Sequence, residues 1–268
     1  MKKLLLAIIT AAAAATATTT AAAEELRLID ATGGAELTIL MQAAMQLTGG
    51  SENTAVSMQK SVPSKALPML ESGRADAVIL DHRFAGKYQN IALAADALAI
   101  CASTANPVRD LTVRDVQEII TLPRPTWKKY INWDEDIQRI AIKPGRPGGT
   151  LLYRIFGKQE FPQEIFRVTT PDSGFAFVNS ASLFFVNFRT ELPSNIKMVR
   201  INGVYPTGAD IRAGRYPLAV KYVIAFKSEH PLLKKLINKI STENIWQRQM
   251  QDSGLLVLLE KPVREAEQ

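Results

Sequence analysis

Residues 91–102 read IALAADALAICA, and residues 216–226 read YPLAVKYVIAF. Both stretches are apolar almost throughout, and each is longer than the usual strand of about 5 to 6 residues. They separate two groups of alternating strands and helices, as set out below. Because only these two long strands connect the groups, we expect two lobes joined by a hinge of crossing strands.

The first group precedes residue 91 and has the order strand, helix, strand, helix, strand. We expect its strands at 26–29, 54–58 and 77–80, one helix between the glycine pairs at 33–34 and 49–50, and a second helix at about 64–71.

The second group lies between the two long stretches. A helix capped by Thr112 has Val116, Ile119 and Ile120 on one face. We expect further strands at 139–143, 183–186 and 197–201 and helices at about 149–156 and 173–179. Two more helices, at about 231–240 and 243–251, follow the second long strand and end before Gly254.

This alternation predicts an α/β protein with mixed sheets flanked by helices. We expect a first lobe formed by residues 24–98, a second lobe formed by residues 99–217, and a return to the first lobe in residues 218–268. The ligand site is expected in the cleft between the lobes.

Residues 1–23 form a separate signal. Lys2 and Lys3 precede the apolar run LLLAII at 4–9, and the segment ends in three alanines at 21–23. This pattern is typical of a signal peptide, so we expect cleavage before Glu24 and release to the periplasm or the exterior. A membrane anchor is the alternative, but the apolar run is well below the roughly 20 residues that a span requires.

Composition indicates which partners to expect. The chain has 32 Lys and Arg against 26 Asp and Glu, and the net charge of +6 falls to +4 without Lys2 and Lys3. The basic residues are scattered, so nucleic-acid binding is not expected. A monomer is expected for a lobe-closing carrier.

Cys101 is the single cysteine and lies inside an apolar strand, so we interpret it as a core residue.

Catalytic patterns are sparse. Only His82 and His230 are present, and no cluster of histidines and cysteines suggests a metal site. Ser64, Thr150 and Ser173 have no evident base that would activate them. We therefore expect neither an enzyme nor a cofactor.

Four loops precede expected helices, at residues 30–35, 62–65, 145–150 and 171–174. The unpaired N–H groups of a helix start favour anions, and two such loops in each lobe would surround one. Ordinary helix capping is the alternative for each loop taken alone. The candidate ligand-binding residues are Thr32, Gly33, Gly34, Ser64, Asp81, Arg146, Gly148, Gly149, Thr150 and Ser173.

Asp81 ends the third expected strand and would face the cleft. A carboxylate there would accept a hydrogen bond, which favours a protonated oxyanion such as hydrogen phosphate over sulfate. The alternative is a turn or a helix cap.

Three segments together resemble the PstS-like phosphate-binding proteins of phosphate ABC importers, within the type II periplasmic-binding-protein superfamily. They are GRADAVILD at 73–81, the segment from Asn106 and Pro107 to Trp127, and INGVYPT at 201–207 with its continuation to Leu218. The resemblance covers nearly the whole chain after the signal segment. It implies that Asp81 accepts a ligand proton and that the loops at Thr32 to Gly34, at Ser64, and at Gly149 and Thr150 donate to the ligand.

The sequence departs from that family in the loop before Thr150. Gly148 stands where the family has a serine, and Pro144 stands where it has an arginine. Arg146, or less favourably Lys143, would have to replace that arginine. Glu36 would repel an anion if it faced the cleft.

We therefore expect an extracytoplasmic solute-binding protein that captures a small oxyanion, first of all phosphate, for the permease of an ABC importer. Two alternatives remain open at this point. One is a carrier for another oxyanion. The other is a degenerate binding-protein-like domain that acts as a sensor or a protein-interaction module.

Overall fold

The structure, a computed structural model, describes residues 24–32, 54–146, 148–157, 161–162 and 164–259. The signal segment, the first expected helix and the loop glycines Gly33 and Gly34 lie outside these residues. Within them, no helix is long and apolar enough to cross a membrane.

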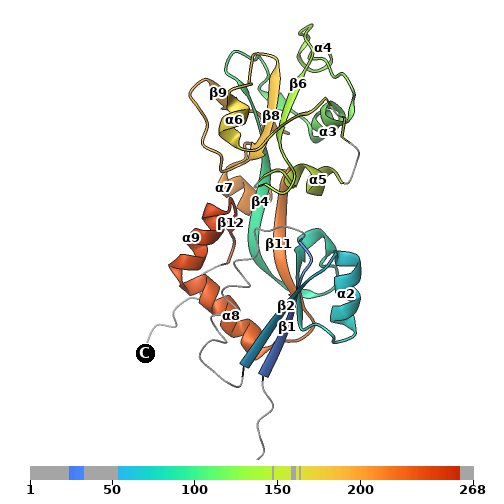
Figure 1. Ribbon diagram of the computed structural model, residues 1–268, viewed down its shortest axis with the longest axis vertical. Coiled ribbons are helices and arrows are strands. Elements are labelled where there is room, and N and C mark those ends of the chain that lie inside the picture. Colours follow the sequence, from blue (N-terminus) through green and yellow to red (C-terminus); the bar gives the residue numbers. More distant parts are fainter. Residues whose placement is uncertain (1–23, 33–53, 147, 158–160, 163, 260–268) are drawn as a thin grey trace, which may run out of the picture.

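Two bodies lie one above the other along the long axis of the molecule (Figure 1). The lower lobe contains β1 (Glu24–Asp30), β2 (Thr54–Lys60), α2 (Pro63–Glu71), β3 (Ala77–Asp81), the short 3-10 helix η1 (His82–Phe84), the first part of β4 (Gln89–Ser103), β11 (Ala219–Phe226) and α8 (Pro231–Thr242). Its sheet has the order β2-β1-β3-β11-β4. β1 runs parallel to β2 and β3, whereas β11 is antiparallel to β3 and β4.

Helices cover both faces of this lower sheet because successive side chains of a strand point to opposite faces. Val78 and Leu80 of β3 pack with the α2 residues Ala66 and Leu70. Ile79, between them, belongs instead to the large core that includes α8. The sheet is therefore buried from both sides, as its nearly continuous apolar strands require.

The upper lobe continues the same sheet. It contains β5 (Asp110–Leu111), α3 (Val113–Thr121), α4 (Lys128–Ile131), β6 (Gln138–Ile142), α5 (Leu151–Phe156), β7 (Phe166–Val168), α6 (Pro171–Phe175), β8 (Ser182–Asn187), β9 (Ile196–Met198) and β10 (Arg200–Ile201). β8, β6 and β7 follow β4 in the order of the sheet, and β5 pairs with β10 separately. Three remaining elements lie near the middle of the molecule: α7 (Gly208–Arg212) and β12 (Leu256–Val257), which contact β4, and α9 (Asn244–Asp252), which contacts β12.

β4 is the strand that both lobes share. From Gln89 to Ala97 it pairs with β11, and from Leu98 to Cys101 it pairs with β8. The partner of β4 thus changes between Ala97 and Leu98. The two-lobed α/β fold expected from the sequence is thus confirmed.

Helix α3 shows how local sequence fixes an upper-lobe element. Thr112 and Asp115 form a capping box at its start, and Val116, Ile119 and Ile120 are buried. At its end, the buried Arg139 side chain donates to the carbonyl oxygens of Ile119, Leu122 and Pro123. These bonds satisfy carbonyls that a helix end leaves unpaired.

The core confirms the interpretation of Cys101. The thiol is fully buried between the β8 and β9 pairings, and burial raises the pKa of Cys101 to about 12. It is therefore inert as a nucleophile at neutral pH.

Some expected boundaries were wrong. The helix expected at 173–179 is α6, which begins at Pro171 because Thr170 caps it and ends at Phe175. The strand expected at 197–201 is interrupted at Val199, so that β9 pairs with β4 whereas β10 pairs with β5. The second long strand begins at Ala219 rather than at residue 216.

A buried polar contact lies beside the exchange of partners in β4. Asp96, 1 % exposed, accepts a hydrogen bond from Asn187 Nδ2 at 2.7 Å. The same Nδ2 donates to the Gly254 carbonyl oxygen at 3.3 Å. Asn187 thus connects the end of β8 to β4 and to the segment before β12.

Replacing Asn187 with leucine removes these donors while keeping a side chain of similar size. We expect Asn187→Leu to lower the free energy of unfolding by about 1–3 kcal/mol, because a buried charged acceptor loses a partner. Urea unfolding followed by circular dichroism measures the change. Asn90→Leu is the matched control on the exposed part of β4 and should alter stability by less than about 0.5 kcal/mol. Equal effects of the two substitutions would contradict the role given to Asn187.

Candidate functional site

The parallel strands of the lower lobe end at a common edge. Asp30 at the end of β1 is in register with Lys60 of β2 and with Ile79 of β3. Thr32 follows β1, and its N–H and hydroxyl both donate to Asp30 Oδ1, at 2.9 and 2.6 Å. Ligand sites of open α/β sheets form outside such carboxyl ends.

Asp81 ends β3 at this edge and is bound to a neighbour two residues along the chain. Its Oδ1 accepts from the Arg83 backbone N–H at 2.9 Å and from Arg83 Nε at 3.1 Å. Its Oδ2 accepts from Nε at 2.9 Å and from Nη2 at 2.5 Å. This bidentate pair raises the pKa of the Arg83 guanidinium. The hydrogen bonds with Asp81 are the main cause, and burial acts in the opposite direction.

A second arginine approaches from the upper lobe. Arg154 of α5 donates through Nη1 to the hydroxyl of Tyr222, and its guanidinium lies 5.3 Å from the centre of that ring. Tyr222 of β11 is opposite Asp81 in the sheet register. Arg83 Nη2 in turn donates to the Arg154 carbonyl oxygen at 3.1 Å. Arg83 of the lower lobe and Arg154 of the upper lobe are therefore in contact, side chain to backbone, beside the end of β3.

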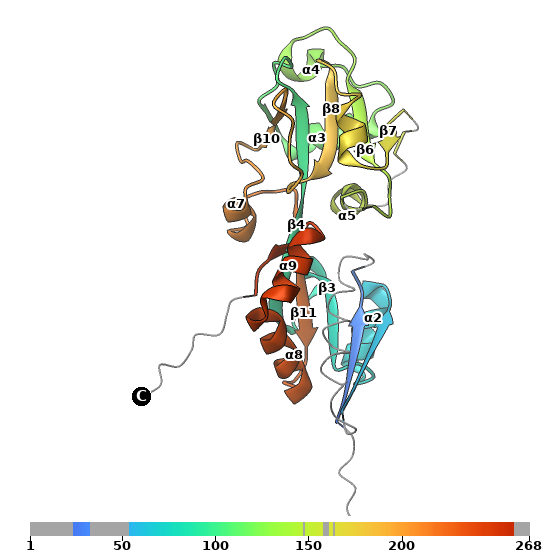
Figure 2. The same cartoon turned by 60° about the vertical axis from the view of Figure 1, so that its left-hand side comes forward.

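Helix α5 is on the side of the upper lobe that is turned toward the lower lobe (Figure 2). It contacts both β4 and β11. The loop before it, after β6, is thereby brought to the lobe boundary.

That loop makes a tight turn that only glycine permits. A Cβ at Gly149 would lie 2.0 Å from the Lys143 carbonyl oxygen. Gly148 has φ +79°, and a Cβ there would lie 3.1 Å from the Asn187 backbone nitrogen. Thr150 begins α5, and its hydroxyl makes no cap for the helix. Arg146 is exposed, and its side chain bonds to none of the residues that the structure describes.

Two further predicted residues occupy helix starts. Ser64 is exposed in the first turn of α2, after the parallel strand β2. Ser173 forms a capping box with Thr170, to whose carbonyl oxygen its hydroxyl donates at 2.8 Å. The hydroxyl of Ser173 is therefore occupied within its own helix.

Arg83 and Arg154 were missed from the sequence. The sequence signal for anion binding lies in residues that precede helices, whereas Arg83 lies within η1 and Arg154 in the last turn of α5. One signal was available for Arg83, since an arginine two residues after a strand-ending aspartate can fold back onto that carboxylate.

The two histidines are possible functional groups. His82 is exposed, and His230 caps α8 by accepting from the Leu232 N–H at 3.2 Å. Within the described ranges, no three residues of the His, Cys, Asp and Glu types form a cluster that could hold a metal ion.

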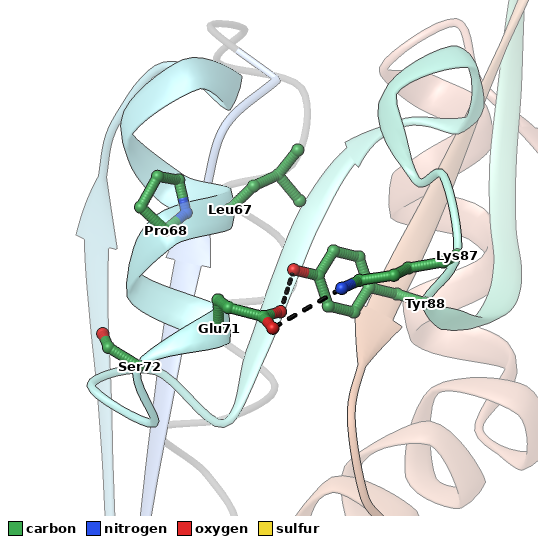
Figure 3. A pocket seen from close by; sticks show the side chains of 6 residues that line it. All are labelled: Leu67, Pro68, Glu71, Ser72, Lys87 and Tyr88. Atoms are coloured by element: carbon green, nitrogen blue, oxygen red, sulfur yellow. Dashed lines mark hydrogen bonds and ion pairs between the residues drawn. The ribbon is translucent and has the colours of Figure 1, made fainter.

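A hollow of about 560 Å³ lies away from the arginines, against α2 (Figure 3). Glu71, Lys87 and Tyr88 point toward one another in it, with Glu71 accepting from the Tyr88 hydroxyl at 2.5 Å and lying 3.5 Å from Lys87 Nζ. The Tyr88 hydrogen bond and the Lys87 charge lower the pKa of Glu71. One carboxylate and one ammonium balance there, so this hollow does not favour an anion.

Comparison with solved structures identifies the architecture. PstS from Borrelia burgdorferi is similar with a TM-score of 0.70 at 16% identity, over 87% of this chain and 98% of that one. A possible phosphate-binding protein from Planctomyces limnophilus gives 0.65 at 15% identity, over 87% and 99%. An ABC-type phosphate transport receptor from Vibrio cholerae gives 0.64 at 18% identity, over 86% and 99%.

This chain has the fold of these binding proteins. No protein-family model matches the sequence, and no curated protein matches it either. At such low identity the likeness establishes the two-lobed binding-protein fold, and the ligand has to be argued from the site itself.

The glycine turn before α5 allows a direct test of how the binding-protein fold forms its upper loop. We expect Gly149→Ala to lower the free energy of unfolding by about 1–3 kcal/mol, because the new methyl group collides with a backbone oxygen that cannot rotate away. Gly208→Ala is the control, since its Cβ would lie 3.7 Å from Leu256, an ordinary contact. Thermal unfolding in which both variants match the parent would refute the tight turn.

Proposed function

We propose that this protein is an extracytoplasmic, monomeric solute-binding protein without enzymatic activity. It captures a small oxyanion, first of all phosphate, between its two lobes and delivers it to the permease of an ABC importer. The proposal extends the sequence-based expectation with two arginines that the sequence did not indicate.

The observation that carries the proposal is the meeting of Arg83 and Arg154. Arg83 belongs to the lower lobe and Arg154 to the upper lobe, and the Arg83 side chain donates through Nη2 to the backbone carbonyl oxygen of Arg154. An anion placed between them would contact both lobes at once, through side chains whose planar donors match an oxyanion. Such a ligand would hold the lobes together.

The surrounding backbone supports an anion further. Three parallel strands of the lower lobe end at this edge, and α5 begins at the loop after β6. The candidate ligand residues are those predicted from the sequence: Thr32, Gly33, Gly34, Ser64 and Asp81 from one lobe, and Arg146, Gly148, Gly149, Thr150 and Ser173 from the other. We add Arg83 and Arg154 to this set.

The names of the solved neighbours favour phosphate among small oxyanions. One of them is a putative substrate-binding protein from Clostridium perfringens with bound phosphate, similar with a TM-score of 0.50 at 14% identity over 87% of this chain and 99% of that one. Sensing or protein interaction without an anion is the competing function, and it predicts no saturable binding.

Calorimetric titration of the protein without residues 1–23 tests the proposal. Phosphate should bind saturably to a single site. Arg154→Met should weaken binding about ten- to a hundredfold, since a hydrogen bond to a charged group contributes about 1.5–3 kcal/mol. Arg114→Met, which removes an exposed arginine of α3, should leave binding unchanged.

Arg146→Ala distinguishes Arg146 from Arg154 as the anion-binding arginine of the upper lobe. If Arg146 replaces the family's arginine, its loss should weaken phosphate binding as much as the loss of Arg154. Absence of heat with phosphate, sulfate and molybdate for the parent protein would overturn the proposed transport function.

A further inference from the structure

We propose that Asp81 holds Arg83 in place as a ligand-facing cation, so that the site selects tetrahedral oxyanions by charge and shape and not by a proton on the ligand. The inference rests on the proposed function and narrows its ligand class. Sulfate, which carries no proton at neutral pH, should bind alongside phosphate.

The first step is the acceptor capacity of Asp81. A carboxylate offers about four lone-pair positions on its two oxygens. In this structure both oxygens accept hydrogen bonds from Arg83, whose donors are its backbone N–H, its Nε and its Nη2. Asp81 is thus engaged at each oxygen before any ligand arrives, whereas a carboxylate that takes a ligand proton must have an oxygen directed at the ligand.

The second step is exposure. The Asp81 side chain is 12 % exposed, whereas the Arg83 side chain is 53 % exposed. The carboxylate therefore lies beneath the guanidinium, and the group presented outward at the end of β3 is a cation. A dianion that approaches this edge meets the positive member of the pair first, so the repulsion expected from a bare carboxylate is absent.

The third step is the donors that Arg83 has left. Its Nε and Nη2 are used by Asp81 and by the Arg154 carbonyl oxygen. Nη1 donates to no residue within the described part of the chain, so its two N–H groups are available. A guanidinium locked on one side by a carboxylate presents its remaining donors in a fixed direction, which suits the oxygens of a tetrahedral anion.

The fourth step is the chemistry of the described groups in contact. Asp81 is bound by Arg83, and Arg83 and the Tyr222 hydroxyl are in turn in contact with Arg154, which brings a second guanidinium to this edge. None of their hydrogen bonds requires the ligand to donate. Recognition by protonation state, which favours hydrogen phosphate over sulfate, would need an Asp81 oxygen that Arg83 leaves open to the ligand.

The experiment is calorimetric titration of the protein without residues 1–23, using inorganic phosphate and sulfate separately at neutral pH. The parent should bind both anions with affinities within about tenfold of each other, because charge and shape hardly differ between them. Arg83→Met should weaken both by about ten- to a hundredfold. Arg74→Met, an exposed arginine of the same lobe, is the matched control and should change neither.

Asp81→Asn distinguishes a positioning residue from a proton acceptor. If Asp81 only positions Arg83, the substitution should leave the ratio of phosphate to sulfate affinity unchanged within about threefold. The reason is that a less firmly oriented Arg83 guanidinium weakens the binding of both anions alike. Arg83→Lys keeps the charge without the fork and should fall between the parent and Arg83→Met for both anions. Circular dichroism of every variant verifies that the fold is intact.

Two results would overturn different statements. A parent that binds phosphate but excludes sulfate by more than about a hundredfold, with Asp81→Asn admitting sulfate, would make Asp81 the proton acceptor and refute this inference alone. A parent that binds neither anion would refute the proposed function itself.

Discussion

The structure depends on one strand that must satisfy its backbone in two different surroundings. β4 is 15 residues long, and its hydrogen-bond partners change from β11 to β8 between Ala97 and Leu98. A buried strand cannot leave its N–H and C=O groups unpaired, so both lobes have to grow outward from it. Tyr216, whose buried hydroxyl donates to the Leu98 carbonyl oxygen at 2.7 Å, adds a side-chain bond at the point of exchange.

Much of this architecture could be predicted because it depends on local, periodic signals. The apolar run at 91–102 indicated β4, and Thr112 with the spacing of Val116, Ile119 and Ile120 indicated α3. Short elements escaped prediction for a physical reason. β7 and β12 contain three and two residues and depend on a neighbouring strand for their hydrogen bonds, which no local pattern encodes. The boundaries between the lobes, expected after residues 98 and 217, stay predictions.

The candidate site was predictable in position more than in chemistry. The loop of Gly148 and Gly149 was expected before a helix and lies before α5. Asp81 was expected at the end of a strand and lies at the end of β3. Its partner Arg83 and the approach of Arg154 depend on side-chain direction and on contact between lobes, which sequence spacing does not determine. A sequence reading finds where backbone donors converge, whereas long cationic side chains can reach such a point from several directions.

The hydrogen bond from Arg83 to the backbone of Arg154 depends on the distance between the two lobes. If the lobes part, that hydrogen bond is exchanged for bonds to water, and such an exchange alters the free energy by only about 0.5–1.5 kcal/mol. This single bond therefore adds little to the free energy that holds the lobes together. The donor that such a separation would free belongs to the guanidinium proposed to face the ligand, so one side chain would take part both in lobe contact and in ligand binding.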